Sequence, residues 1–317
     1  MLKDFLRTAD LIPEDLETLL DLSETYKTEP FHDESDLRGR MVVLYFGKPS
    51  TRTRLSFESA VLQLGGLPAT VGPNELQLGR GETIEDTARI ISAYAAAFVI
   101  RTFSDEDVER FAAAATIPVI NALTDGHHPC QSIADVFTIR RHFGRLKGIR
   151  IVYVGDGNNV AHSLMEAAAL AGMRIVVATP PGFEPDPVVT SDATAIAETT
   201  GGSVEVTNDP LQAAEGADVI YTDVWVSMGT PESERGERLQ RLAPFQVNEE
   251  LMGRAAPDAI FMHCLPAHRG EEVAGPVIDG PRSVVFEQAA NRGPTEQAVL
   301  YALRHGLLRG RETDGMA

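Results

Sequence analysis

Cysteine is nearly absent from this chain, since only Cys130 and Cys264 occur among its 317 residues. Two cysteines exclude a disulfide framework, so we expect free thiols in a reducing compartment. Basic residues are also too few to balance the acidic ones, and the formal net charge is -18. Nucleic acids and anionic membranes require basic surface, so neither is expected as a partner.

Long hydrophobic runs are absent as well. No stretch is apolar over the length needed to cross a bilayer, and the first residues lack the pattern of a secretory signal. We therefore expect a soluble, cytoplasmic protein. The hydrophobic content of 43% and charged content of 23% are ordinary for a globular chain, and 317 residues are enough for two domains.

Strand and helix patterns alternate along the whole chain, which predicts α/β architecture. We expect two domains, each a mostly parallel sheet flanked by helices, comprising residues 1–146 and 147–293. The last helix, within residues 294–317, is expected to pack back on the first domain. The predicted strands cover residues 41–46, 98–100, 118–121, 149–154, 174–178, 204–206, 219–221, 259–261 and 284–286. The predicted helices cover residues 13–25, 55–64, 84–95, 105–114, 132–143, 193–200 and 295–308, with one more after Asn159.

A dense group of anion-binding side chains follows the first predicted strand. The five residues are Ser50, Thr51, Arg52, Thr53 and Arg54, and they stand where the strand gives way to a helix. The N-terminus of a helix attracts anions through free N–H groups and the helix dipole. Arginine forks and hydroxyl donors match phosphate oxygens. Any one of these residues could be a helix cap or a solvated arginine, but together they predict a phosphate site.

Two other glycine-rich segments are poor nucleotide motifs. Gly155-Asp156-Gly157-Asn158-Asn159-Val160 follows a strand, but Val160 replaces the third glycine of a dinucleotide fingerprint. Residues 79–83 contain no P-loop lysine. We therefore expect no nicotinamide or nucleotide cofactor.

Further polar groups follow other predicted strands, where ligands usually bind in open α/β sheets. These groups are Arg101-Thr102, the segment from His128 to Gln131, the segment from Asp223 to Gly229, and the segment from His263 to Pro266. The histidines and cysteines among them could suggest zinc, but their spacing fits no standard zinc site. No metal is expected.

These motifs resemble the aspartate and ornithine carbamoyltransferases. Ser50 to Arg54 is similar to the carbamoyl phosphate motif of that family, and His128-Pro129-Cys130-Gln131 is similar to its second shared motif. Asp223 with Ser227-Met228-Gly229, and His263-Cys264-Leu265-Pro266, favour the ornithine branch. The resemblance extends over nearly the whole chain.

The resemblance implies that residues 1–146 bind carbamoyl phosphate. It assigns catalytic roles to Arg101, His128, Asp223 and Cys264. It assigns carbamoyl phosphate contacts to a larger set: Ser50, Thr51, Arg52, Thr53, Gln77, Arg101, His128, Gln131, Cys264, Leu265 and Arg292. Gln77 would act in a neighbouring subunit, so the resemblance implies a homotrimer or a multiple of trimers.

The resemblance further implies that residues 147–293 bind L-ornithine through Asn159, Asp223, Ser227 and Met228. The reaction would convert carbamoyl phosphate and ornithine into citrulline and phosphate without a cofactor, in arginine biosynthesis or degradation. A carbamoyltransferase for putrescine, N-acetylornithine or N-succinylornithine is an alternative. A non-catalytic homologue and a phosphate-sensing protein are two further alternatives, although neither would need all of these residues.

Overall fold

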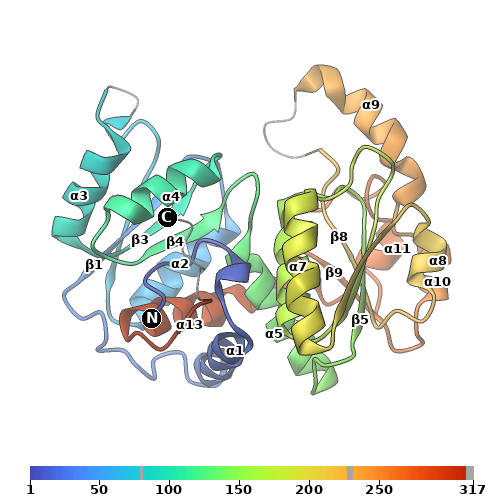
Figure 1. Cartoon of the computed structure of the whole chain (residues 1–317), viewed down its shortest axis with the longest axis horizontal. Coiled ribbons are helices and arrows are strands. Elements are labelled where there is room, and N and C mark those ends of the chain that lie inside the picture. Colours follow the sequence, from blue (N-terminus) through green and yellow to red (C-terminus); the bar gives the residue numbers. More distant parts are fainter. Residues whose placement is uncertain (79–80, 227–230, 312–317) are drawn as a thin grey trace. The chain divides into compact units, whose positions relative to one another are not determined.

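The chain forms two compact units, which the computed structural model describes over residues 1–78, 81–226 and 231–311. The first unit comprises Met1–Phe137 with Asn291–Ala317, and the second comprises Thr138–Ala290. Each contains one parallel sheet flanked by helices (Figure 1), which confirms the predicted fold class. Helix α5 (Pro129–Phe143) begins in the first unit and ends in the second.

The sheet of the first unit has the strand order β2-β1-β3-β4. Its strands are β1 (Met41–Phe46), β2 (Leu67–Val71), β3 (Ala95–Arg101) and β4 (Val119–Leu123). All neighbours are parallel. The central strands are apolar almost without alternation, as expected for strands that helices cover on both faces. Val42, Leu44, Val99 and Ile100 are accordingly buried.

Two groups of helices cover this sheet (Figure 1). One group packs together and contains α1 (Pro13–Thr28), α2 (Arg52–Gln63) and α13 (Arg292–Arg304). The other contains α3 (Ile84–Tyr94) and α4 (Asp105–Ala114), which also contact each other. Right-handed crossovers explain the division, because the chain moves one way from β1 to β2 and the opposite way from β2 through β3 to β4. A short 3-10 helix, Thr8–Asp10, precedes α1.

The sheet of the second unit has the strand order β7-β6-β5-β8-β9, again with parallel neighbours only. Its strands are β5 (Arg150–Val154), β6 (Arg174–Ala178), β7 (Ser203–Thr207), β8 (Val219–Thr222) and β9 (Ile260–His263). Its helices are α6 (Asn159–Leu170), α7 (Pro187–Thr200), α8 (Pro210–Ala214), α9 (Glu232–Leu242), α10 (Glu249–Arg254), α11 (Gly275–Ile278) and α12 (Val285–Ala290). A 3-10 turn, Ala243–Phe245, follows α9.

Several elements differ from the sequence predictions. The short helices α8, α10 and α11 were not predicted, and three further differences have a clear physical cause. The predicted strand at residues 284–286 is wrong, because these residues lead into helix α12; a short apolar run fits either a strand or a helix. Strand β2 was not predicted, since Pro68 interrupts it, and proline is tolerated there because β2 lies at the sheet edge. Helix α9 was not predicted because it is polar nearly all round and contains Gly236.

Within the described residues, none of the helices has both the length and the apolar character required to span a membrane. Both cysteines are free; Cys130 is buried and Cys264 is half-buried.

Gly157 provides a test of the loop after β5. A Cβ atom at this position would lie 2.3 Å from the backbone nitrogen of Pro185 and 2.7 Å from the carbonyl carbon of Glu184. Backbone must therefore move, and we expect Gly157→Ala to lower the free energy of unfolding by about 1–3 kcal/mol. Gly253 is the matched control, because a Cβ there meets nothing within 4 Å. Gly253→Ala in helix α10 should raise stability by about 0.5–1 kcal/mol. Equal unfolding midpoints for the two variants in urea would contradict this reading of the loop.

Candidate active site

Several cationic residues of the first unit follow strands at the point where the chain turns in opposite directions. The chain leaves β1 towards β2 on one side and leaves β3 towards β4 on the other. Ligands in open α/β sheets bind at such a switch point, beyond the carboxyl ends of the strands. The segment from Ser50 to Arg54 follows β1, and Arg101 is the last residue of β3. Phe46 lies opposite Arg101 in the register, so the two ends are adjacent.

Thr53 is the meeting point of two arginines. Its hydroxyl oxygen accepts hydrogen bonds from Arg101 Nη1 at 3.4 Å and from Arg292 Nη2 at 3.2 Å. Helix α2 begins at Arg52, and among the described residues no side chain caps it at Thr51. Its first backbone N–H groups have no partner within the helix and are suited to hold an anion. Two guanidinium groups and the first turn of helix α2 thus come together at Thr53.

A hydrogen-bonded turn holds the segment before α5. Asp105 accepts from the Thr124 hydroxyl at 2.6 Å and the Gly126 N–H at 3.0 Å, and its Oδ1 lies 2.8 Å from Nδ1 of His127. Burial alone would raise the pKa of Asp105, but the hydrogen bonds from His127 and Thr124 outweigh it and lower that pKa. His127 is therefore engaged in holding this turn, directly before His128.

His128 is buried beside three arginines. Burial lowers its pKa well below the usual value, and the charges of Arg292, Arg101 and Arg52 lower it further. The imidazole is therefore neutral at physiological pH and carries one N–H donor and one acceptor. A neutral donor next to a cationic anion site suits a carbonyl oxygen that becomes negative during a reaction.

Arg292 reaches this group from helix α13. Its Nη1 donates to Gln131 Oε1 at 2.8 Å, and its Nε donates to Glu296 Oε1 at 2.9 Å. Gln131 in turn donates from Nε2 to Asp135 Oδ1 at 2.8 Å. These four side chains are all buried. The network brings a residue from the end of the chain into contact with the segments after β1 and β4.

A cavity of about 460 Å³ opens beside the start of α2. It is lined by Lys48, Ser50 and Arg54, together with the backbone turn after β2. Arg54 is exposed and donates from Nε to Glu58 Oε1 at 2.9 Å, so it is engaged on its own helix. Gln77 is exposed and lies in the loop after β2.

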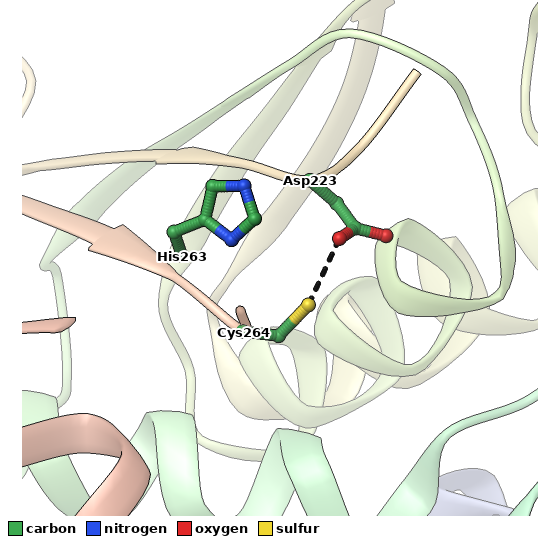
Figure 2. Close-up of side chains that lie close together, drawn as sticks. All are labelled: Asp223, His263 and Cys264. Atoms are coloured by element: carbon green, nitrogen blue, oxygen red, sulfur yellow. Dashed lines mark hydrogen bonds between the residues drawn. The ribbon is translucent and has the colours of Figure 1, made fainter. Parts of the chain in front are cut away.

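The second unit has a polar group at its own switch point, between β5 and β8. Asp223 follows β8 and is 6% exposed. Its Oδ1 accepts from the Cys264 thiol at 2.9 Å, and its Oδ2 accepts from Asn158 Nδ2 at 2.9 Å. Figure 2 shows the thiol of Cys264 pointing at the Asp223 carboxylate, with the His263 ring nearby. Both donors are neutral, so the buried carboxylate is well placed to receive a cationic group.

Asn158 contacts Asp223 but was not among the site residues predicted from the sequence. The prediction named Asn159, the first residue of α6, whereas Asn158 is the side chain that contacts Asp223. Asn158 Oδ1 also caps α6 by accepting from the N–H of Val160 at 2.9 Å. Tyr153 donates its hydroxyl to the same oxygen at 3.2 Å. An asparagine at the N-cap of a predicted helix was the available signal.

His263 is the last residue of strand β9 and directly precedes Cys264. Its Nδ1 accepts from the Leu265 N–H at 2.8 Å, so the ring proton lies on Nε2, which is 3.3 Å from Glu272 Oε1. Asp223, His263 and Cys264 have potential metal-ligating atoms within 4.8 Å of one another. Both ring nitrogens of His263 are already engaged, with the Leu265 N–H and with Glu272, whereas Asp223 and Cys264 are hydrogen-bonded to each other.

A second residue pair near Asp223 was also missed. Asp156 accepts from Arg238 of α9, and Arg238 Nε donates to the Trp225 carbonyl oxygen at 3.0 Å. Burial raises the pKa of Asp156 to about 6; Arg238 opposes the rise and Asp223 adds to it. Two carboxylates thus lie close together in this unit. Helix α9 was not predicted, so its arginine could not be placed from the sequence.

The structure therefore brings the predicted residues into two groups, one in each unit. The first contains Ser50 to Thr53, Arg101, His128, Gln131 and Arg292; the second contains Asp223, Cys264 and Leu265, with Asn159 on α6 beside them. Ser227 and Met228 lie outside the described residues.

Both halves of the chain match known domains. Residues 3–141 match the aspartate/ornithine carbamoyltransferase carbamoyl-P binding domain, and residues 147–303 match the Asp/Orn binding domain of the same family. The chain belongs to the aspartate/ornithine carbamoyltransferase family.

Several members of this family resemble the chain over nearly its full length. The ornithine carbamoyltransferase of Anoxybacillus flavithermus is 52% identical over 303 residues, which cover 95% of this chain and 96% of that protein. The ornithine carbamoyltransferase of Thermococcus kodakarensis is 52% identical over 307 residues, covering 96% and 97%. The solved structure of ornithine carbamoyltransferase from Pyrococcus furiosus matches with a TM-score of 0.91 at 50% identity, covering 95% of this chain and 96% of that one.

The predicted phosphate-binding residues of the first unit can be tested by substituting Arg52. We expect Arg52→Ala to weaken the binding of carbamoyl phosphate and of inorganic phosphate and to reduce turnover by about 10²–10³-fold, because a buried anion loses a charged donor. Arg52→Lys should recover little, since an ammonium group cannot reproduce the guanidinium fork. Arg7→Ala, which removes an exposed ion pair with Glu109, is the matched control. Calorimetric titration with phosphate that gives wild-type affinity for Arg52→Ala would remove this residue from the site.

Proposed function

We propose that this protein transfers the carbamoyl group of carbamoyl phosphate to the δ-amino group of L-ornithine, giving L-citrulline and phosphate. The observation that carries the proposal is the hydrogen bond between Cys264 and the buried Asp223, on a chain about half identical to proteins named ornithine carbamoyltransferase. We assign residues 1–146, with the returning C-terminal helix, to carbamoyl phosphate and residues 147–293 to ornithine.

Phosphate binding would use the helix N-terminus and the arginines. In this proposal Ser50, Thr51, Arg52, Thr53 and Arg101 hold the phosphate oxygens. The contacts of Arg101 and Arg292 with Thr53 support it, because they show that cationic donors converge on one hydroxyl. Helix N–H groups and guanidinium forks are the two donor types that proteins use most effectively for a dianion.

The carbamoyl group needs donors for its oxygen and acceptors for its NH2. Arg101, Thr53 and the neutral His128 would donate to the carbonyl oxygen as it gains negative charge. Gln131 Oε1 would accept from the NH2, with the backbone carbonyls of Cys264 and Leu265 as further acceptors. The low pKa of His128 supports this role, because a neutral imidazole can donate a hydrogen bond to the carbonyl oxygen without adding a positive charge that would compete with the arginines for the phosphate.

Ornithine carries two amines and one carboxylate. Asp223 would pair with the α-amino group, and Asn159 would contribute a neutral contact, as Ser227 and Met228 are predicted to do. Cys264, hydrogen-bonded to Asp223, would steer the δ-amino group. We infer that Asn158 orients the Asp223 side chain, because it donates a hydrogen bond to the second carboxylate oxygen.

The chemical step requires a neutral δ-amine. Its lone pair attacks the carbamoyl carbon and forms a C–N bond, while the carbonyl oxygen becomes an oxyanion. The bond from that carbon to the phosphate oxygen then breaks, and the departing phosphate takes the proton that the nitrogen loses. Positioning and electrostatic stabilisation would supply most of the rate enhancement.

Substrate specificity tests the ornithine assignment. Purified protein should form citrulline from carbamoyl phosphate and ornithine, and its kcat/KM for N-acetylornithine should be lower by about 10² or more, because the acetylated α-nitrogen carries no charge and leaves Asp223 without a cation. Asp223→Asn should lower kcat/KM for ornithine strongly and change that for N-acetylornithine little. Arg269→Gln, which breaks the exposed ion pair with Asp279, is the control. Equal efficiency of the wild-type protein with both amines would overturn the ornithine assignment.

We also propose that the protein is a homotrimer or a multiple of trimers, in which Gln77 reaches carbamoyl phosphate in a neighbouring subunit. Its exposure in the loop after β2 supports this role, since an exposed side chain is available to another chain. The cytoplasmic location and a place in arginine metabolism stay predictions.

Mixed subunits test this assembly. A Gln77→Ala subunit retains its own Arg52, and an Arg52→Ala subunit retains Gln77, so one hybrid interface in a mixed oligomer is complete. Co-expression of the two weakly active variants should therefore restore part of the wild-type activity. A monomer with full activity in size-exclusion chromatography with light scattering would refute the shared site.

A further inference from the structure

Glu296 is a fully buried carboxylate that the proposed reaction does not use directly. It lies one turn after Arg292 on helix α13 and has no exposed surface. Its Oε1 accepts from both Nε and Nη2 of Arg292, at 2.9 Å and 2.5 Å. A buried ion pair costs desolvation energy and is tolerated when its geometry is good and further hydrogen bonds are made. Two hydrogen bonds to one oxygen constrain the plane of the Arg292 guanidinium.

The remaining donors of Arg292 point at two residues of the proposed carbamoyl phosphate site. Nη1 donates to Gln131 Oε1 at 2.8 Å, and Nη2 donates to the Thr53 hydroxyl at 3.2 Å. Arg101 donates to the same hydroxyl at 3.4 Å. A rotation of the Arg292 guanidinium would therefore change the surroundings of Thr53 and Gln131 together.

The amide of Gln131 is held at both ends. Its Oε1 accepts from Arg292, and its Nε2 donates to Asp135, a second carboxylate with no exposed surface. This network assigns the amide oxygen and nitrogen. An amide oxygen has two lone pairs, so Oε1 can accept a second hydrogen bond from a carbamoyl NH2.

We propose that Glu296 is a positioning residue for carbamoyl transfer: it fixes the guanidinium plane of Arg292 and, through Arg292, presents the amide oxygen of Gln131 to the carbamoyl NH2. This inference rests on the proposed function. Glu296 acts through Arg292 and touches no reacting atom. Its negative charge also compensates Arg292 in a part of the unit where Arg52 and Arg101 add further positive charge.

The two ions of the pair stabilise each other's charge. Burial raises the pKa of Glu296 to about 7, while Arg292 opposes that rise. Burial likewise disfavours the charged form of Arg292, but Glu296, with smaller contributions from Cys130 and Asp135, offsets it and the pKa of Arg292 is raised. Burial raises the pKa of the Cys130 thiol on α5, and the negative charge of Glu296 raises that pKa further.

Glu296→Gln is the informative substitution, because it keeps the shape and one acceptor oxygen but removes the charge. We expect kcat to fall by about 10–100-fold, as a small misplacement of a reacting group can cost that much. The affinity for inorganic phosphate should be unchanged or higher, since phosphate has no NH2 to orient and the site has lost a negative charge. Glu109→Gln, which breaks the exposed Arg7 pair in the same unit, is the matched control and should behave as wild type.

A loss of kcat with phosphate affinity retained supports the positioning role. Wild-type kcat for a folded Glu296→Gln overturns it, and so does a parallel loss of phosphate affinity. If wild-type protein forms no citrulline, the proposed function itself fails, and that result is separate from any effect of the substitution.

A double substitution keeps the test decisive if Glu296→Gln does not fold. Removing both charges together leaves no unpaired buried ion. In the Arg292→Gln background, Glu296→Gln should change kcat by less than about twofold, because a residue that acts only through Arg292 has nothing left to position. A further loss of about tenfold in that background would overturn the proposal.

Discussion

Parallel pairing is the constraint on which both candidate half-sites depend. Every strand in either unit pairs in parallel, so all strands of one sheet end at the same edge. Residues that are distant in sequence then meet without any special interaction between the loops. Thr53 and Arg101 come together in this way, as do Asp223 and Cys264. The order of the strands also creates a point in each sheet where two loops diverge and leave room for a ligand.

The charge around the candidate anion site is opposite in sign to the net charge of the molecule. The chain has a formal net charge of -18, yet Arg52, Arg101 and Arg292 gather around the neutral His128. Such a cluster is unfavourable when it is empty, because like charges repel and burial removes solvent. Buried Glu296 reduces this cost at Arg292. The net charge of the chain therefore does not indicate the charge at the candidate anion site.

The sequence was sufficient for the fold class and for most of the polar residues that the structure groups together. Strong apolar runs bounded by glycine or polar turns predicted most strands, and the dense hydroxyl and arginine cluster predicted the start of α2. The failures have physical causes. Pro68 concealed an edge strand, residues 284–286 are apolar enough for either type of element, and α9 lacks a continuous apolar face. Asn158 and Glu296 were missed because their importance lies in what they contact, and spacing along the chain does not reveal a contact between Glu296 and a residue that reaches Gln131 and Thr53.

The return of α13 to the first unit has a consequence for the order in which the chain can fold during synthesis. The second unit is one continuous segment, Thr138–Ala290, and all its strands and helices are available once that segment has left the ribosome. The first unit is discontinuous. Helices α1 and α2 pack against α13, which is translated more than 220 residues after the end of α2. Arg292 arrives with that helix. A nascent chain therefore has β1 to β4, with Thr53 and Arg101, long before α13 supplies the contacts of Arg292 to Thr53 and Gln131, so the polar network of this unit gains its last arginine only late in translation.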